Sequence, residues 1–150
     1  MDIDKMRFEH LMVERDFACA ASTLRCVFWN IGQWKDIWCP VDTVYVNYDD
    51  GCHQEFEMRV QWSGRQQHVR TVRLLTEAGD ILFFCPTPPF NLVYQSGLWA
   101  FQDCANGCRV RAERWFIPRM QKNQEMDRFK NEFKQRLIEL LLRISDSVVE

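Results

Sequence analysis

The chain has few of the residues that mark fibrous, disordered or nucleic-acid-binding proteins. Its 150 residues include only 6 Gly and 5 Pro, which excludes collagen-like and low-complexity sequences. Its 19 basic residues are balanced by 21 acidic ones, so it lacks the surplus of positive charge that binds phosphate backbones. No run reaches the ~18 apolar residues of a membrane span, and the first residues lack the basic and apolar stretches of a signal peptide. We therefore expect a cytoplasmic protein with no nucleic-acid partner and no stable membrane insertion.

The sequence also lacks the spacing of a metal site or a disulfide framework. Its 3 histidines form no ligand spacing with the one close cysteine pair, Cys104 and Cys108. The 7 cysteines are odd in number, and without a signal peptide we expect them to be reduced thiols. There is no G-x-S-x-G motif and no phosphate loop. We therefore expect no metal and no cofactor, and hydrolases, kinases and metalloenzymes are disfavoured.

Aromatic residues are the component present in excess. The chain has 11 Phe, 6 Trp and 3 Tyr within a hydrophobic content of 47%. A chain of this length buries about 70% of its unfolded surface, enough for one core, so we expect one domain spanning 1–150. Aromatic side chains beyond the needs of that core often line a pocket for a flat or apolar ligand.

The periodicity of the apolar residues predicts the order of the elements. Residues 6–17 alternate and indicate a first strand, and a short helix follows, capped by Ser22 or Thr23 and ended by Gly32. A second short helix is expected at 33–38. The segment 41–117 has a period of two, with strands expected at 41–48, 52–62, 66–75, 81–85, 92–102 and 109–117. From about residue 123 an apolar stripe indicates one long amphipathic helix.

This order predicts an α+β fold. A curved antiparallel sheet of about seven strands wraps around the long C-terminal helix, with two short helices after the first strand. Such a sheet leaves an internal cavity between its concave face and the helix. We expect a cavity of at least roughly 300 Å³, the lower end for ligand sites, and a core without a cavity of this size would count against a ligand-binding function.

Four motifs resemble the START-like helix-grip superfamily and are most similar to its bacterial polyketide aromatase/cyclases (the polyketide cyclase/dehydrase and lipid-transfer family). These motifs are Phe8-Glu9-His10, Trp34-Lys35-Asp36-Ile37-Trp38-Cys39-Pro40, Val69-x-Thr71-x-Arg73 and Ser96-Gly97-Leu98-Trp99-Ala100-Phe101. The chain departs from the family pattern at four places. Val69 replaces a Trp, Thr71 replaces a Ser, Arg114 matches a His of some members, and Phe133 falls near an acid of others.

The resemblance implies a polyketide-binding enzyme that promotes intramolecular aldol cyclisation and dehydration to an aromatic ring. Its substrate would be tethered to an acyl carrier protein and supplied by a ketosynthase. A second hypothesis is a non-catalytic carrier of a lipid, a quinone or an aromatic small molecule. A third is an interaction subunit whose cavity is filled by its own side chains. The oligomeric state stays open, a homodimer included.

Two arginines are the candidate catalytic groups. Arg73 is the one catalytic residue that the resemblance carries over. It either faces a wet cavity without a packed partner, which we favour, or lies at the rim beside Glu77. Arg114 falls on the apolar face of the last strand, where it either lines the cavity or reaches solvent at the strand's end. We expect His53 and His68 to face outward, and His10 is a lesser acid–base candidate. The candidate substrate-binding residues are Trp38, Gln54, Phe56, Met58, Thr71, Tyr94, Trp99, Phe129 and Phe133.

Overall fold

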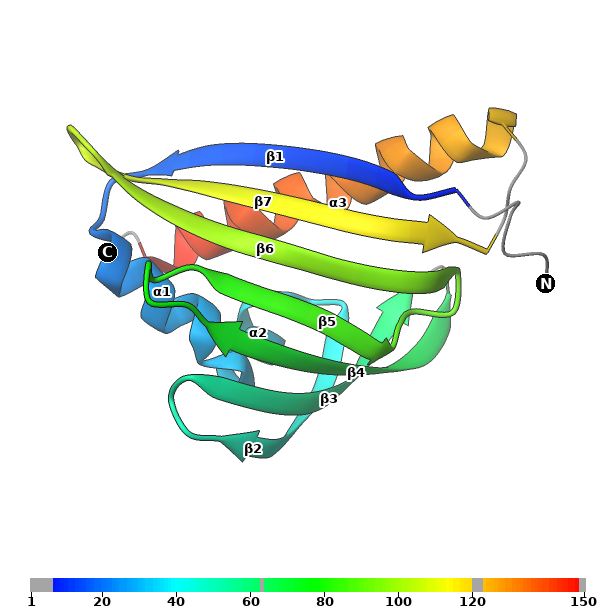
Figure 1. Cartoon of the computed structure of the whole chain (residues 1–150), viewed down its shortest axis with the longest axis horizontal. Coiled ribbons are helices and arrows are strands. Elements are labelled where there is room, and N and C mark those ends of the chain that lie inside the picture. The colour runs from blue at the N-terminus through cyan, green and yellow to red at the C-terminus, as the bar shows by residue number, and fades with distance from the viewer. Residues whose placement is uncertain (1–6, 63, 120–122, 149–150) are drawn as a thin grey trace.

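The computed structural model describes residues 7–62, 64–119 and 123–148 and has the expected helix-grip architecture (Figure 1). The strands are β1 (Glu9–Phe17), β2 (Val41–Asp49), β3 (His53–Trp62), β4 (Arg65–Leu75), β5 (Ile81–Thr87), β6 (Leu92–Cys104) and β7 (Gly107–Pro118). The helices are α1 (Ala21–Trp29), the 3₁₀ turn η2 (Ile31–Gln33), α2 (Trp34–Ile37) and α3 (Asn123–Val148).

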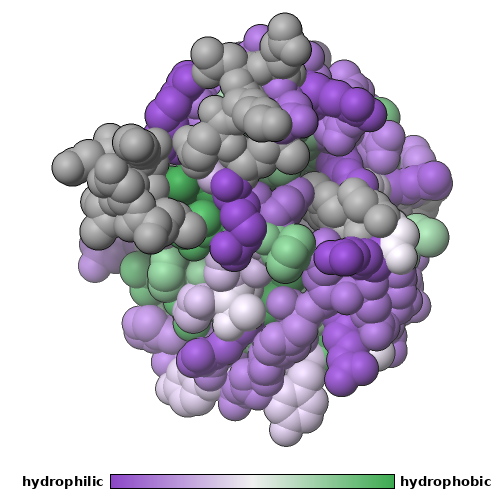
Figure 2. Space-filling view, turned by 90° about the vertical axis from the view of Figure 1, so that its right-hand side faces the viewer, coloured by the Kyte–Doolittle hydropathy of each residue, from purple (hydrophilic) through white to green (hydrophobic). Residues whose placement is uncertain are grey.

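The seven strands form one antiparallel sheet in the order β1-β7-β6-β5-β4-β3-β2. The long helix α3 lies along one face of this sheet, and α1 lies towards the side of the molecule where α3 ends (Figure 1). The short helix α2 contacts α3. Seen from the end where α3 begins and β7 ends, most of the surface is hydrophilic, and hydrophobic residues are visible only in patches between polar ones (Figure 2).

The core lies between the inner face of the sheet and α3. Alternation along β7 buries Val110, Ala112 and Phe116, because successive side chains of a strand point to opposite faces. The apolar stripe of α3 packs against this face, since helical spacing places its residues on one side. Its buried members are Met126, Phe133, Leu137, Leu140, Leu141 and Ile144.

The start of α1 differs from the prediction. Its N-cap is Ala20, and neither Ser22 nor Thr23 caps the helix. An acceptor from the sheet serves its first turn instead, because the Ala21 backbone N–H donates to Asp103 Oδ1 at 3.4 Å. A tertiary contact has therefore replaced the local cap that the sequence favoured.

Two further boundaries differ. The helix α1 ends at Trp29 rather than at Gly32. The strand β5 continues through Pro86 to Thr87, beyond the end at residue 85 that the sequence predicted. The pairing with β4 shifts from Arg70 with Thr87 to Val72 with Phe84, so β5 has one residue more than β4 in this stretch, and this bulge in β5 accommodates the proline.

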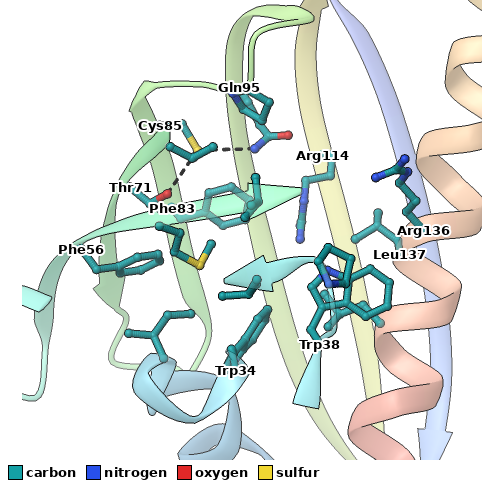
Figure 3. Close-up of a pocket in the computed structure, with 18 of the residues that line it drawn as sticks. Trp34, Trp38, Phe56, Thr71, Phe83, Cys85, Gln95, Arg114, Arg136 and Leu137 are labelled. Carbon is teal, nitrogen blue, oxygen red and sulfur yellow. Dashed lines mark hydrogen bonds between the residues drawn. The ribbon is translucent and has the colours of Figure 1, made fainter. Parts of the chain in front are cut away.

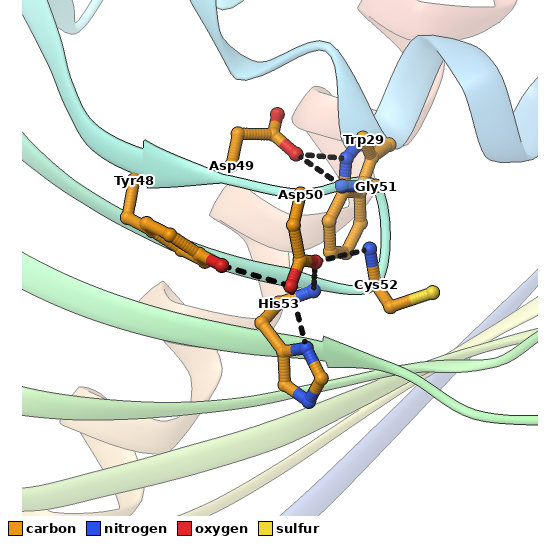
Figure 4. A network of polar contacts seen from close by, with 7 residues as sticks. All are labelled: Trp29, Tyr48, Asp49, Asp50, Gly51, Cys52 and His53. Carbon is orange, nitrogen blue, oxygen red and sulfur yellow. Dashed lines mark hydrogen bonds and ion pairs between the residues drawn. The ribbon is translucent and has the colours of Figure 1, made fainter.

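Two adjacent carboxylates hold the expected hairpin turn between β2 and β3 (Figure 4). Asp50 accepts hydrogen bonds from the backbone N–H groups of His53 and Cys52, at 2.6 and 2.9 Å. These two donors hold the pKa of the Asp50 carboxyl well below its ordinary value. Asp49 accepts a hydrogen bond at 3.2 Å from the indole of Trp29, so the turn is joined to the end of α1.

Candidate functional site

A cavity of about 180 Å³ lies between the inner face of the sheet and the helices α2 and α3 (Figure 3). Its walls are mainly apolar and come from η2, α2, strands β2 to β7 and α3. The lining residues are Ile31, Trp34, Trp38, Pro40, Val41, Phe56, Met58, Val60, Val69, Thr71, Arg73, Phe83, Cys85, Pro89, Gln95, Trp99, Arg114, Phe133, Arg136, Leu137 and Leu140.

The cavity is smaller than the size of at least roughly 300 Å³ that the fold class predicts, and that expectation is wrong. Aromatic packing at one end of the core explains the difference. The ring of Phe28 contacts the rings of Trp34, Trp99 and Phe101, with centroids 5.9, 4.7 and 5.2 Å away. Part of the aromatic excess therefore fills the core. The remaining space matches a compact ligand, since a cavity of about 150 Å³ holds a benzene ring.

One row of residues across the sheet organises the polar part of the site. The strand register places Gln54, Arg73, Phe83, Gly97 and Arg114 side by side on β3 to β7. A Cβ atom at Gly97 would lie 2.4 Å from the ring of Phe83, so only glycine leaves room for that ring. The glycine of the Ser-Gly-x-Trp motif thus lets Phe83 lie beside Arg114.

The guanidinium of Arg114 is buried between two aromatic rings and points into the cavity (Figure 3). Its Cζ lies 4.3 Å from the ring centroid of Trp99 and 4.5 Å from that of Phe83. Nη1 donates to the backbone oxygen of Glu113 at 2.8 Å. Burial lowers the pKa of Arg114 to about 9, so the group is a cation at neutral pH. No carboxylate among the described residues forms an ion pair with it.

Arg73 is bound by partners in the protein rather than facing open space. Nε donates to Gln54 Oε1 at 2.7 Å, and the two Nη atoms donate to the backbone oxygens of Phe28 and Trp29 at 2.8 Å each. The Gln54 amide in turn donates to Trp29 O and to Asp49 Oδ2, at 2.9 and 3.0 Å. The expectation of an arginine without packed partners is wrong, because Arg73 binds the last carbonyl groups of α1. Its role in catalysis stays a prediction.

Burial lowers the pKa of Arg73 to about 9, and the Asp49 carboxylate opposes this change. Burial also opposes ionisation of Asp49. Hydrogen bonds from Gln54, Gly51 and Trp29, together with the charge of Arg73, nevertheless hold the pKa of Asp49 below its ordinary value. Arg73 and Asp49 are therefore both charged at neutral pH, and they stabilise the junction of α1 with β2, β3 and β4.

A neutral polar cluster forms another part of the cavity wall (Figure 3). The Cys85 thiol lies 3.5 Å from Thr71 Oγ1 and accepts a hydrogen bond from Gln95 Nε2 at 3.4 Å. Burial raises the pKa of Cys85, so the group is a thiol rather than a thiolate at neutral pH. The cluster can bind an uncharged oxygen of a ligand but supplies no strong nucleophile.

A β-bulge decides which side chains of β6 enter the site. The register shifts between Leu92 and Tyr94, so Gln95 faces the cavity and Tyr94 faces outward. The ring of Tyr94 packs 5.5 Å from that of Phe8 and 5.7 Å from that of Phe84. Gln95 was not among the predicted residues, although two steps of two positions back from Trp99 along the same strand reach it.

The structure brings together most of the predicted residues. The ones that line the cavity are Trp38, Phe56, Met58, Thr71, Arg73, Trp99, Arg114 and Phe133. Gln54 is buried but lies outside the lining, and its amide is bound within the Arg73 network. Phe129 also lies outside it and packs on Phe116, with ring centroids 5.9 Å apart. His10 lies on the outer face, where its Nε2 is 3.0 Å from Glu113 Oε1.

The charged groups of the cavity wall are all cationic. Arg73, Arg114 and Arg136 line it, and no acidic residue or histidine does so within the described part of the chain. Trp38, Pro40 and Arg136 also line an outer groove of about 520 Å³, so they stand between the groove and the cavity. The rest of the groove is lined by Gln61, Asn131, Glu132, Gln135 and Glu139, so it contains two carboxylates.

Residues 7–62, 64–119 and 123–148 contain no cluster of three or more His, Cys, Asp or Glu residues with metal-binding geometry. None of their helices combines the length and apolarity that crossing a membrane requires. All 7 cysteines are free.

Comparison of the structure with solved structures identifies the fold. No family model matches the sequence, and no curated protein matches it. The di-domain aromatase/cyclase StfQ from the steffimycin biosynthetic pathway superposes with a TM-score of 0.83 at 13% identity, over 95% of this chain and 51% of that one. This chain thus spans about half the length of StfQ.

Two further structures are similar over most of both chains. The Zhui aromatase/cyclase from Streptomyces sp. R1128 has a TM-score of 0.67 at 17% identity, over 93% of this chain and 87% of that one. A START superfamily protein from Mycobacterium smegmatis has a TM-score of 0.76 at 11% identity, over 95% and 98%. The protein therefore has the START-like helix-grip fold, which polyketide aromatase/cyclases share.

Proposed function

We propose that this protein is an aromatase/cyclase-like enzyme that binds the ring-forming part of a short poly-β-ketone and promotes intramolecular aldol cyclisation and dehydration. The observation that carries the proposal is Arg114, a buried cation that has no carboxylate partner among the described residues and points into an apolar cavity. Such a preorganised donor stabilises an oxyanion that develops during a reaction, because it requires little reorganisation at that moment.

The reaction would proceed through an enolate held by Arg114. A carbon between two ketone groups loses a proton, and its enolate oxygen accepts a hydrogen bond from the guanidinium. The carbon then attacks another ketone farther along the same chain. The oxygen of that ketone takes up a proton and becomes a hydroxyl group. Loss of water and enolisation give the aromatic ring. The proton carrier would be water or the substrate's own enol, since no histidine or acidic residue lines the described cavity wall.

The size of the cavity limits the substrate. A space of about 180 Å³ accommodates one ring with small substituents, so the rest of a longer chain would lie in the outer groove. Trp34, Trp38 and Phe56 would pack on the forming ring and hold the chain bent, which supplies the proximity that an intramolecular reaction needs. Delivery by an acyl carrier protein in the cytoplasm, next to a ketosynthase, completes the proposal.

A second candidate function is a carrier of a compact aromatic molecule without chemistry. The absence of an acidic residue or histidine from the described lining favours it. A carrier and a cyclase would share the cavity and the contacts to Arg114. They differ in whether the bound molecule leaves unchanged.

The test is a reconstituted reaction with a minimal ketosynthase and acyl carrier protein. Product profiles are compared for no added protein, the wild type, Arg114→Met, and Arg59→Gln, which removes an exposed arginine of β3 as a matched control. The proposal predicts that the wild type and Arg59→Gln increase the fraction of one cyclised product and that Arg114→Met does not. Identical profiles with and without the wild type would overturn the cyclase and leave the carrier.

A further inference from the structure

The cavity combines features that neutral ligands do not require. Its charged lining residues are Arg73, Arg114 and Arg136, without an acid in the described lining, although the chain as a whole has a net charge of −2. A cation that is removed from water without a carboxylate partner destabilises the folded protein. Arg114 is only 5% exposed. A ligand that supplies the missing negative charge would offset this cost.

The contacts of Arg114 define where that charge would lie. Trp99 and Phe83 lie within 4.5 Å of the guanidinium carbon, and Nη1 is bound to the backbone oxygen of Glu113. Hydrogen bonds leave a guanidinium along its edges. No hydrogen bond from Nε or Nη2 to a described residue is present, and the group points into the cavity (Figure 3). These donors therefore face the position of a ligand oxygen.

The other two arginines do not play this part. The donors of Arg73 are directed at Gln54 and at two backbone oxygens. Arg136 is a wall residue that the cavity shares with the outer groove. Arg114 is thus the group that would recognise an anion inside the cavity.

We propose that the cavity selects compact planar molecules that carry one ionised oxygen, namely aromatic carboxylates and phenolates, over their neutral analogues, and that Arg114 sets this preference. The inference deepens the proposed function and rests on the same cavity, because an enolate and the phenolate of an aromatised product share this chemistry. The volume of about 180 Å³ restricts the ligand to about one ring. The apolar wall around Trp34, Trp38 and Phe56 fits the ring's faces.

The test uses matched probes that differ in charge. Binding of benzoate and of benzamide, which have nearly the same shape, is measured by calorimetry at neutral pH with the wild type, Arg114→Lys, Arg114→Met and Arg59→Gln. We expect the wild type and Arg59→Gln to bind benzoate at least tenfold more tightly than benzamide. Arg114→Met should lose roughly 10- to 100-fold of the benzoate affinity and little of the benzamide affinity, because one charge-assisted contact is lost. Arg114→Lys should retain part of the preference, since it keeps the charge and loses the planar fork.

A second measurement reads the charge at the site directly. The absorbance of para-nitrophenol reports its ionisation, and a cation at contact distance lowers the pKa of a bound acid by about 1–3 units. We expect this shift with the wild type and not with Arg114→Met. Equal affinities for benzoate and benzamide, or an unshifted pKa of the bound phenol, would overturn the inference even if cyclisation occurs. Selective benzoate binding without any cyclisation would leave the inference standing and overturn the enzymatic proposal.

Discussion

Replacement of Arg73 by Ala should destabilise the protein strongly. The change removes three hydrogen bonds of 2.7–2.8 Å from a side chain that is 5% exposed. Each hydrogen bond to a charged group contributes ~1.5–3 kcal/mol. The net loss of stability is smaller than the sum of these three contributions, because the variant no longer buries a cation. It is still large, because the Phe28 backbone oxygen and Gln54 Oε1 each lose the hydrogen bond from Arg73. Removal of one partner from a buried charged network costs about 3–5 kcal/mol, and we expect a loss in this range.

Thermal melting and urea unfolding measure this loss. At about 2–4 °C per kcal/mol for a chain of this size, the melting temperature of Arg73→Ala should fall by roughly 6–20 °C. The matched control is Arg109→Ala, which removes an exposed arginine paired with Asp16 at 2.8 Å and should leave the melting temperature close to that of the wild type. Arg73→Lys should fall between the two, because one ammonium group cannot replace all three contacts. An Arg73→Ala variant that melts within a degree or two of the control would refute this reasoning.

Three further predictions concern other parts of the molecule. Gly97→Ala should lower the melting temperature and weaken benzoate binding, because the added Cβ would lie 2.4 Å from the Phe83 ring. The control is Gly32→Ala, whose added Cβ would have its nearest neighbour 3.9 Å away. Equal melting temperatures of the two variants would contradict the packing argument. The pKa of Asp50 is lowered in the folded state, so its contribution to stability is full above the unfolded pKa of about 3.9 and is lost as the pH falls through the lower folded value. Asp50→Asn should therefore show a shallower loss of melting temperature below about pH 4, and parallel pH profiles would exclude this role. Thiol titration should find 7 free cysteines after denaturation, with the two buried thiols, Cys85 and Cys108, unreactive in the native protein; a stable disulfide in fresh material would contradict the expectation.

Strand alternation was sufficient to place much of the candidate site. It put Phe56 and Met58 on the inner face of β3 and Arg114 on the inner face of β7, because the period of two holds wherever pairing is regular. Counted in steps of two from Trp99, it also puts Gln95 inward and Tyr94 outward, although Tyr94 was expected to bind substrate. It fails at Leu92, which is buried although Tyr94 faces outward, because the β-bulge between them depends on how β6 pairs with β7.

The environment of Arg73 could not be predicted from its own strand either. Its partners are the backbone oxygens of Phe28 and Trp29 at the end of α1, more than forty positions earlier in the chain. The end of α1 is itself displaced from Gly32, where the sequence put it. The size of the cavity could not be predicted from the sequence pattern either, because it depends on how the aromatic rings around Phe28 pack together.

The most direct test of the central claim measures product formation and thermal stability together for one variant, Arg114→Met. If Arg114 is the functional cation of the cavity, this variant should melt at or above the temperature of the wild type, because a buried charge without a carboxylate partner is replaced by an apolar side chain of similar length. It should at the same time lose the cyclised product of the ketosynthase reaction. A variant that folds and cyclises as well as the wild type would contradict the account.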